Sequence, residues 1–204
     1  AYLNYIEAYY EKNGSLDGSA MNYWSKLRER AGVDTDFNKT IAATDMQKES
    51  QNDWGAYSKG TLINSTLYNI RRERRSEFIA DGMRWVDLIR WRSLDQLESN
   101  PYQIEGFKLW GPMEQWYDKP EGGSNLTASN VSSKSLSEYL RVNQINTLNN
   151  LVFNGYRWTE AHYLSPIAIQ HFLITSSDNA TISTSPIYQN PGWPTQADQG
   201  PIGY

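Results

Sequence analysis

The stretch that decides the fold is residues 70–91, IRRERRSEFIADGMRWVDLIRW. It belongs to a helical pattern over 62–81, in which apolar residues recur at helical spacing: Ile63, Leu67, Ile70 and Phe78. Gly82 stands where a helix commonly ends in a left-handed residue, and it predicts the end of this helix. A second helix is expected directly afterwards, with an apolar side made of Trp85, Leu88, Ile89 and Trp91. The sequence therefore predicts a pair of helices within 62–98.

Charged residues crowd the first of these helices, where four arginines surround two glutamates: Arg71, Arg72, Arg74, Arg75, Glu73 and Glu77. Glu77 lies three residues after Arg74, a spacing at which helical side chains face each other, and Arg84 and Asp87 repeat this spacing in the second helix. Guanidinium groups satisfy carboxylates and helix-end carbonyls where two helices meet, and buried charges must be paired. We interpret these residues as a structural network rather than an anion site or an acid/base pair.

The composition excludes several classes of function. A net charge of −4, with the positive charge concentrated in one helix that is also rich in acids, argues against nucleic acid as a partner. The absence of cysteine removes disulfides, thiol nucleophiles and cysteine-based metal sites. The 8 Trp, 14 Tyr and 5 Phe in a polar chain favour binding, because Trp and Tyr offer a flat apolar face with a polar handle.

Outside 62–98 the pattern predicts one helical hairpin and long loops. Residues 1–32 are expected to form two helices, the first ending at Asn13 and the second capped by Ser19, with the small and aromatic positions of a tetratricopeptide repeat. Residues 33–60 are irregular apart from one short helix that Thr44 would open.

The C-terminal region, 99–204, is rich in Pro, Gly, Asn and Ser and shows no sustained periodicity. Ser165 followed by Pro166 predicts one short apolar helix there, because serine caps a helix and proline suits its first position. The predicted fold class is mainly α, with helical hairpins and long irregular loops.

The stretch 70–91 resembles the signature of the SusD/RagB family, roughly E-R-x-x-E-(hydrophobic)-x-x-(E/D)-G-x-R-(aromatic)-x-D-L-x-R-W. Every fixed position is present: Glu73, Arg74, Glu77, Gly82, Arg84, Asp87, Leu88, Arg90 and Trp91. Three further segments resemble the family in the same order, namely LRERAG at 27–32, YLSPI at 163–167 and YQNPGW at 188–193.

The resemblance implies a SusD-like α/α superhelix of tetratricopeptide-like hairpins, of which residues 1–204 would be the C-terminal part, because family members are usually much longer and begin with a lipoprotein cysteine. It also implies a function. Such a protein faces outward on the cell outer membrane, held by a lipid anchor outside this chain, and sits on a SusC-like TonB-dependent transporter. It captures an oligosaccharide and delivers it inward, with no cofactor and no catalysis.

Three alternatives stay open at this point. Some members of the family bind peptides, and a purely structural half could dock the transporter without touching a ligand. A glycoside hydrolase is disfavoured, because its acid carboxyl needs a raised pKa, whereas Glu73 and Glu77 lie beside four arginines, an environment unsuited to such an acid. The only histidines, His162 and His171, are interpreted as local hydrogen-bonding residues.

Sugar binding needs a flat aromatic side chain beside planar polar groups. The best local match is an irregular segment that carries Asn52, Asp53, Trp54 and Tyr57. A second loop cluster carries Trp110, Trp116 and Tyr117. Three other tryptophans, at helical spacing, are expected in the core: Trp24, Trp85 and Trp91.

One run of residues has the spacing of a calcium loop: Asp34, Asp36, Asn38 and Asp45. Lys39 occupies the position where such a loop needs glycine, and the closing acid is Asp rather than Glu. The sequence therefore favours a polar loop after a helix, and no metal is expected.

Overall fold

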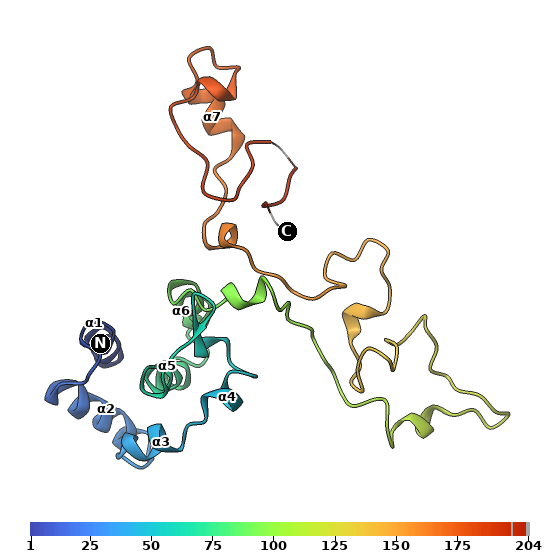
Figure 1. Ribbon diagram of the computed structural model, residues 1–204, viewed down its shortest axis with the longest axis horizontal. Coiled ribbons are helices and arrows are strands. Elements are labelled where there is room, and N and C mark those ends of the chain that lie inside the picture. The colour runs from blue at the N-terminus through green and yellow to red at the C-terminus, as the bar shows by residue number, and fades with distance from the viewer. Residues whose placement is uncertain (197, 203–204) are drawn as a thin grey trace. The chain divides into compact units, whose positions relative to one another are not determined.

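The computed structural model describes residues 1–196 and 198–202, and the chain divides into two compact units, Ala1–Gln96 and Leu97–Tyr204. Six α-helices of the described residues lie in unit 1 and one lies in unit 2, and a single two-stranded sheet is present among them (Figure 1). The prediction of a mainly α fold with long loops is confirmed. No helix within the described residues has the length and apolar character that crossing a membrane requires.

Unit 1 begins with α1 (Tyr2–Asn13) and α2 (Gly18–Arg30). The predicted end of α1 is confirmed, because Gly14 adopts a left-handed φ of 68° and its N–H bonds to the carbonyl of Tyr10. The predicted cap of α2 is wrong by two residues. Asp17 caps this helix by accepting from the Ala20 N–H at 2.7 Å, which leaves Ser19 inside the first turn.

Two short helices, a 3-10 helix and a hairpin connect α2 to the signature region: α3 (Phe37–Ala43), α4 (Met46–Glu49), η1 (Trp54–Ala56), β1 (Tyr57–Ser58) and β2 (Thr61–Leu62). The strands pair antiparallel, with Tyr57 opposite Leu62. Thr44 does not open a helix as predicted. It ends α3, and Asp45 caps α4 by accepting from two backbone N–H groups.

The signature region forms α5 (Ser65–Glu77) and α6 (Met83–Arg90). The predicted helix over 62–81 is too long at both ends, because Leu62 belongs to β2 and the chain turns after Glu77 through a left-handed Ala80 at φ 68°. Gly82 is left-handed, at φ 70°, but it directly precedes α6 rather than ending α5. Gly82 therefore has the predicted left-handed conformation, but it begins the second helix of the pair instead of ending the first.

The core of unit 1 lies between α1, α2, α3 and α5 and contains Ile6, Ala20, Trp24, Phe37 and Ile70. The rings of Trp24 and Phe37 stack with centroids 4.3 Å apart and planes 2° from parallel. Burial is confirmed for Trp24 and Trp91, but Trp85 is 50% exposed, so its prediction as a core residue is wrong. The buried face of α6 is centred on Asp87 and Leu88, which leaves Trp85 at its margin.

Unit 2 is built mainly from loops and 3-10 helices: η3 (Glu114–Tyr117), η4 (Val142–Gln144), η5 (Glu160–Tyr163) and η6 (Ile182–Thr184). The segment η2 (Asp95–Leu97) contains the boundary between the units. Isolated antiparallel bridges join Tyr102 to Tyr156 and Lys108 to Tyr139. Positions 197, 203 and 204 of the predicted C-terminal region lie outside the described residues.

The only α-helix described in unit 2 is α7 (Ile169–Thr175), which begins later than Ser165 and Pro166 predict. The reason is that the side chains of residues 189–193 hold the backbone of 161–167. The Gln189 amide accepts from the Ile167 N–H at 2.8 Å and donates to the Ile167 carbonyl at 2.9 Å. Asn190 donates to the carbonyl of Ser165 at 2.6 Å. These bonds hold residues 165–167 outside any helix.

Trp193 adds two bonds of the same kind, because its indole N–H donates to the carbonyls of Ala161 and Leu164, at 2.8 and 2.7 Å. Gly192 is left-handed at φ 77°, and a Cβ atom there would lie 2.8 Å from the Cβ of Ala161. The segments YLSPI and YQNPGW are therefore two halves of one structural lock.

We expect Gly192→Ala to destabilise this lock by more than about 1 kcal/mol, because the new methyl group adds both backbone strain and a steric overlap. Hydrogen exchange of residues 161–167 measures the effect, and these amides should lose protection. Gly200→Ala is the control, because a Cβ atom at Gly200 would meet no other atom within 4 Å and the residue has no positive φ. Equal exchange in both variants and the parent protein would contradict the lock.

Candidate ligand-binding site

A pocket of about 330 Å³ lies within unit 2 and is lined by three segments of the chain. Its apolar wall consists of Trp110, Leu126, Ala128, Val131, Leu136 and Ile145. Its polar wall consists of Thr127, Ser132, Ser133, Lys134 and Gln144. The pocket thus combines a flat indole with hydroxyl, amide and ammonium groups, the combination that binding of a polyhydroxylated ligand requires.

Hydrogen bonds from Arg141 hold two walls of this pocket together. The Arg141 backbone N–H donates to the buried hydroxyl of Ser132 at 2.9 Å, and its guanidinium donates to the Gln144 side-chain carbonyl at 3.2 Å. Arg141 also pairs with Glu105 at 2.8 Å. The hydroxyl of Ser137 and the guanidinium of Arg141 both donate to Glu105 and lower its pKa.

Lys134 links the pocket to η3. Its Nζ lies 2.8 Å from Oε2 of Glu114 and 5.9 Å from the ring centroid of Trp110, within the range of a cation–π contact. The backbone N–H of Trp110 donates to the Glu138 carbonyl at 3.0 Å, which fixes the backbone that carries the indole. The ammonium therefore stands beside the aromatic wall with its charge already paired.

The structure places the three predicted residues of this region differently. Trp110 is partly buried and lines the pocket, whereas Trp116 is 71% exposed and does not line it. Tyr117 is partly buried, and its carbonyl accepts from the Asn125 N–H at 2.8 Å. Sequence reasoning missed Lys134 and Gln144, since they lie in aperiodic segments where nothing marks them as pocket residues.

The other predicted cluster belongs to unit 1 and is organised by a buried carboxylate. Asp53 is only 6% exposed and accepts from the Gly55 N–H at 2.9 Å, from the Tyr68 hydroxyl at 3.3 Å and from Arg75 at 2.7 Å. Arg84 also donates to this carboxylate. With both oxygens used in this way, Asp53 is a structural residue and is not presented to a ligand.

The neighbours of Asp53 are more accessible. Asn52 is exposed, whereas Trp54 and Tyr57 are partly buried. The carbonyl of Tyr57 accepts from Arg71 at 3.0 Å, and burial lowers the pKa of Arg71 to about 10. The segment that carries Trp54 and Tyr57 is thus bonded to α5 through Arg71, which donates to the carbonyls of Gly55 and Tyr57.

The calcium-loop residues have structural partners. Asp36 and Asp45 cap α3 and α4, and Asp34 pairs with Lys39 at 2.7 Å. Lys39 thus places an ammonium where a cation would bind, and Asn38 donates its backbone N–H to Asp36. Among residues 1–196 and 198–202, no group of three or more His, Cys, Asp or Glu side chains is arranged to hold a metal ion.

The signature residues of α5 and α6 pair mainly with other elements, although Arg90 also pairs with Asp87 of its own helix at 2.9 Å. Arg74 bonds to Asp87 at 2.7 Å, Arg84 to Asp53, and Glu73 to Arg28 at 3.2 Å. Glu77 pairs with Arg30 of α2, not with Arg74 as its spacing suggests. The network therefore joins α5 to the helices around it.

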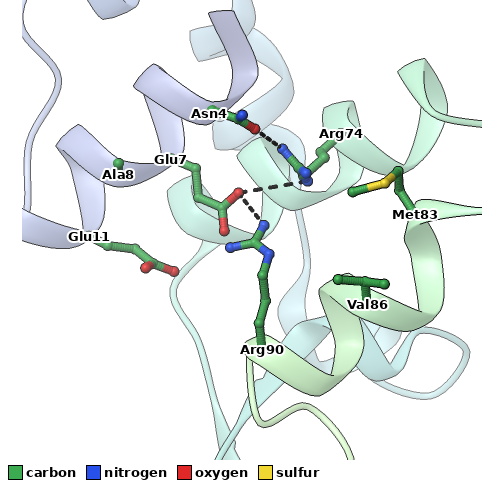
Figure 2. A pocket seen from close by; sticks show the side chains of 8 residues that line it. All are labelled: Asn4, Glu7, Ala8, Glu11, Arg74, Met83, Val86 and Arg90. Carbon is green, nitrogen blue, oxygen red and sulfur yellow. Dashed lines mark hydrogen bonds and ion pairs between the residues drawn. The ribbon is translucent and has the colours of Figure 1, made fainter. Parts of the chain in front are cut away.

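A second pocket of about 370 Å³ lies in unit 1 between α1, α5 and α6. Figure 2 shows Glu7 of α1 with its carboxylate directed at the guanidinium groups of Arg74 and Arg90, and Asn4 directed at Arg74. Glu7 is 3% exposed, bonds to Arg90 at 2.6 Å and accepts from the indole N–H of Trp91. Because these charges satisfy one another, we interpret this pocket as structural.

Sequence reasoning missed Glu7, although it follows the core residue Ile6 directly. An acid beside an apolar position on a helix is normally solvated, so only the partner arginines reveal its burial.

The comparisons with known proteins identify the family of this sequence. The family model of the SusD family matches residues 1–193, nearly the whole chain. The chain belongs to the SusD family. No curated protein and no solved structure matches the sequence. SusD proteins bind nutrients, including glycans, in association with outer-membrane transport, and they are generally non-catalytic lipoproteins of that membrane.

We expect Glu7→Gln to lower the free energy of unfolding by roughly 3 kcal/mol, because it leaves a buried arginine network short of one negative charge. Urea unfolding followed by the helical circular-dichroism signal measures this change, since six of the seven described α-helices lie in unit 1. Glu29→Gln on α2 is the matched control, because Glu29 is exposed. Similar unfolding of the two variants would show that Glu7 has no structural role.

Proposed function

We propose that this SusD-family chain binds an oligosaccharide in the Trp110 pocket of unit 2 and delivers it to a SusC-like TonB-dependent transporter without catalysing a reaction. The observation that carries the proposal is the family match over residues 1–193. Proteins of this family pair with SusC-like transporters and bind glycans. Attachment to the outer membrane through a lipid anchor outside this chain, with the pocket facing outward, is part of the same proposal.

The chemistry of the pocket supports a sugar as the ligand. The Trp110 ring offers an apolar surface for the C–H face of a pyranose, and the neighbouring hydroxyls of Thr127 and Ser133 can exchange hydrogen bonds with sugar hydroxyls. The volume of about 330 Å³ lies at the low end for small-molecule sites, which suits one sugar residue of a longer chain.

The state of the acids supports binding without hydrolysis. A glycosidase needs two carboxyl groups across the bond, one of them protonated. Glu114, the acid joined to Lys134 of the pocket, is ion-paired, and Glu105 has a lowered pKa. The lowered pKa makes Glu105 a poor general acid, and Glu114 is already engaged with Lys134.

We expect Trp110→Ala to weaken binding of an oligosaccharide roughly five- to thirty-fold, because an aromatic contact contributes about 1–2 kcal/mol. A glycan array that includes neutral and acidic oligosaccharides identifies an oligosaccharide that the wild-type protein binds. Calorimetric titration then measures the affinity of each variant for this oligosaccharide. Trp110→Phe keeps a ring in place and should retain most of the binding.

Trp116→Ala serves as the positional control, because the Trp116 ring is exposed outside the pocket. If Trp116→Ala loses binding and Trp110→Ala does not, the ligand lies on the exposed ring instead. If the protein binds peptides but no glycan, the peptide-binding alternative replaces this proposal.

A further inference from the structure

The charges around the Trp110 pocket are balanced pair by pair. Among the described residues that line the pocket, Lys134 alone has a formal charge, and Glu114 lies 2.8 Å from its Nζ. Behind the walls, Arg141 pairs with Glu105 at 2.8 Å, and Lys108 pairs with Glu138 at 2.6 Å. Each of these three cations of unit 2 thus has its own carboxylate.

The remaining polar groups of the pocket are uncharged hydrogen-bonding groups. The hydroxyls of Thr127 and Ser133 bond to neighbouring serines at 2.8 Å and can turn toward a ligand. The Gln144 carbonyl is held by Arg141, which leaves its NH₂ group as a donor on the pocket wall. These donors and acceptors match the hydroxyl groups of a sugar.

An anionic ligand would meet different conditions. A carboxylate or sulfate loses its hydration on entering a pocket, and this cost is recovered only by an uncompensated cation or several strong donors. The one cation on the wall already has Glu114 beside it, so a ligand anion near Lys134 would meet attraction and repulsion of similar size.

We infer that the Trp110 pocket takes one uncharged sugar residue, and that the Lys134–Glu114 pair makes the site select neutral glycans over glycans that carry carboxylate or sulfate groups. This inference rests on the proposed function and names its substrate class. Glu114 is the specificity-determining residue, because its removal exposes the charge of Lys134 next to the indole.

The test compares two forms of one ligand, the tightest neutral oligosaccharide on the array and the same oligosaccharide oxidised at C6 from the alcohol to the carboxylate. The wild-type protein should bind the neutral form at least about tenfold more tightly, with Trp110→Ala weakening it about fivefold or more. Glu114→Gln should strengthen binding of the oxidised form roughly three- to fivefold and so reduce the preference for the neutral form. This gain should decrease in high salt.

Glu121→Gln is the matched control, because it makes the same change of net charge at an exposed position outside the pocket. Equal gains in both variants would overturn the role of the Lys134–Glu114 pair. Wild-type protein that prefers acidic glycans would overturn the inference and leave glycan binding intact. Absence of binding to any glycan would instead overturn the proposed function itself.

Discussion

Three carboxylates, those of Glu7, Asp53 and Asp87, are buried in unit 1, and each accepts hydrogen bonds from at least two donors. A buried carboxylate without such partners would cost several kcal/mol, so each one fixes the elements that supply its donors. Glu7 ties α1 to α6, Asp53 ties η1 to both signature helices, and Asp87 ties α6 to α5. The arrangement of the helical unit depends on these charges meeting, which explains why the family signature consists so largely of Arg, Glu and Asp.

Unit 2 is stabilised by a different kind of interaction. Its described part has one α-helix, and its loops are fixed mainly by side chains that bond to backbone groups, as Gln189, Asn190 and Trp193 do. Such bonds satisfy the polar backbone where neither helix nor sheet does so. The Trp110 pocket is formed partly in the same way, since the Ser132 hydroxyl accepts from the Arg141 backbone N–H, while a bond between side chains joins Arg141 to Gln144. A rigid pocket can therefore exist in a region with little regular structure.

The sequence predicted the helical class and the end of α1, because apolar periodicity and Gly14 depend only on local geometry. It misplaced the start of α7, since the Gln189 and Asn190 bonds that hold residues 165 and 167 come from more than twenty positions along the chain. Asp53 looked like a ligand residue for a similar reason, as its partners Arg75 and Arg84 are distant in sequence. For the pocket, aromatic content pointed to Trp110, but no periodic pattern links 110 to Lys134 and Gln144.

Unit 1 is held together by buried charge pairs and the loops of unit 2 by bonds between side chains and backbone, and this difference has a consequence for how ligand preference can change. The pocket walls at 126–136 and 144–145 contribute nothing to the apolar core of α1, α2, α3 and α5. If the proposed site is correct, substitutions in these walls would change which ligand fits and leave the buried charges of the helical unit in place. A change of ligand in such a protein would therefore require substitutions in only a few loops.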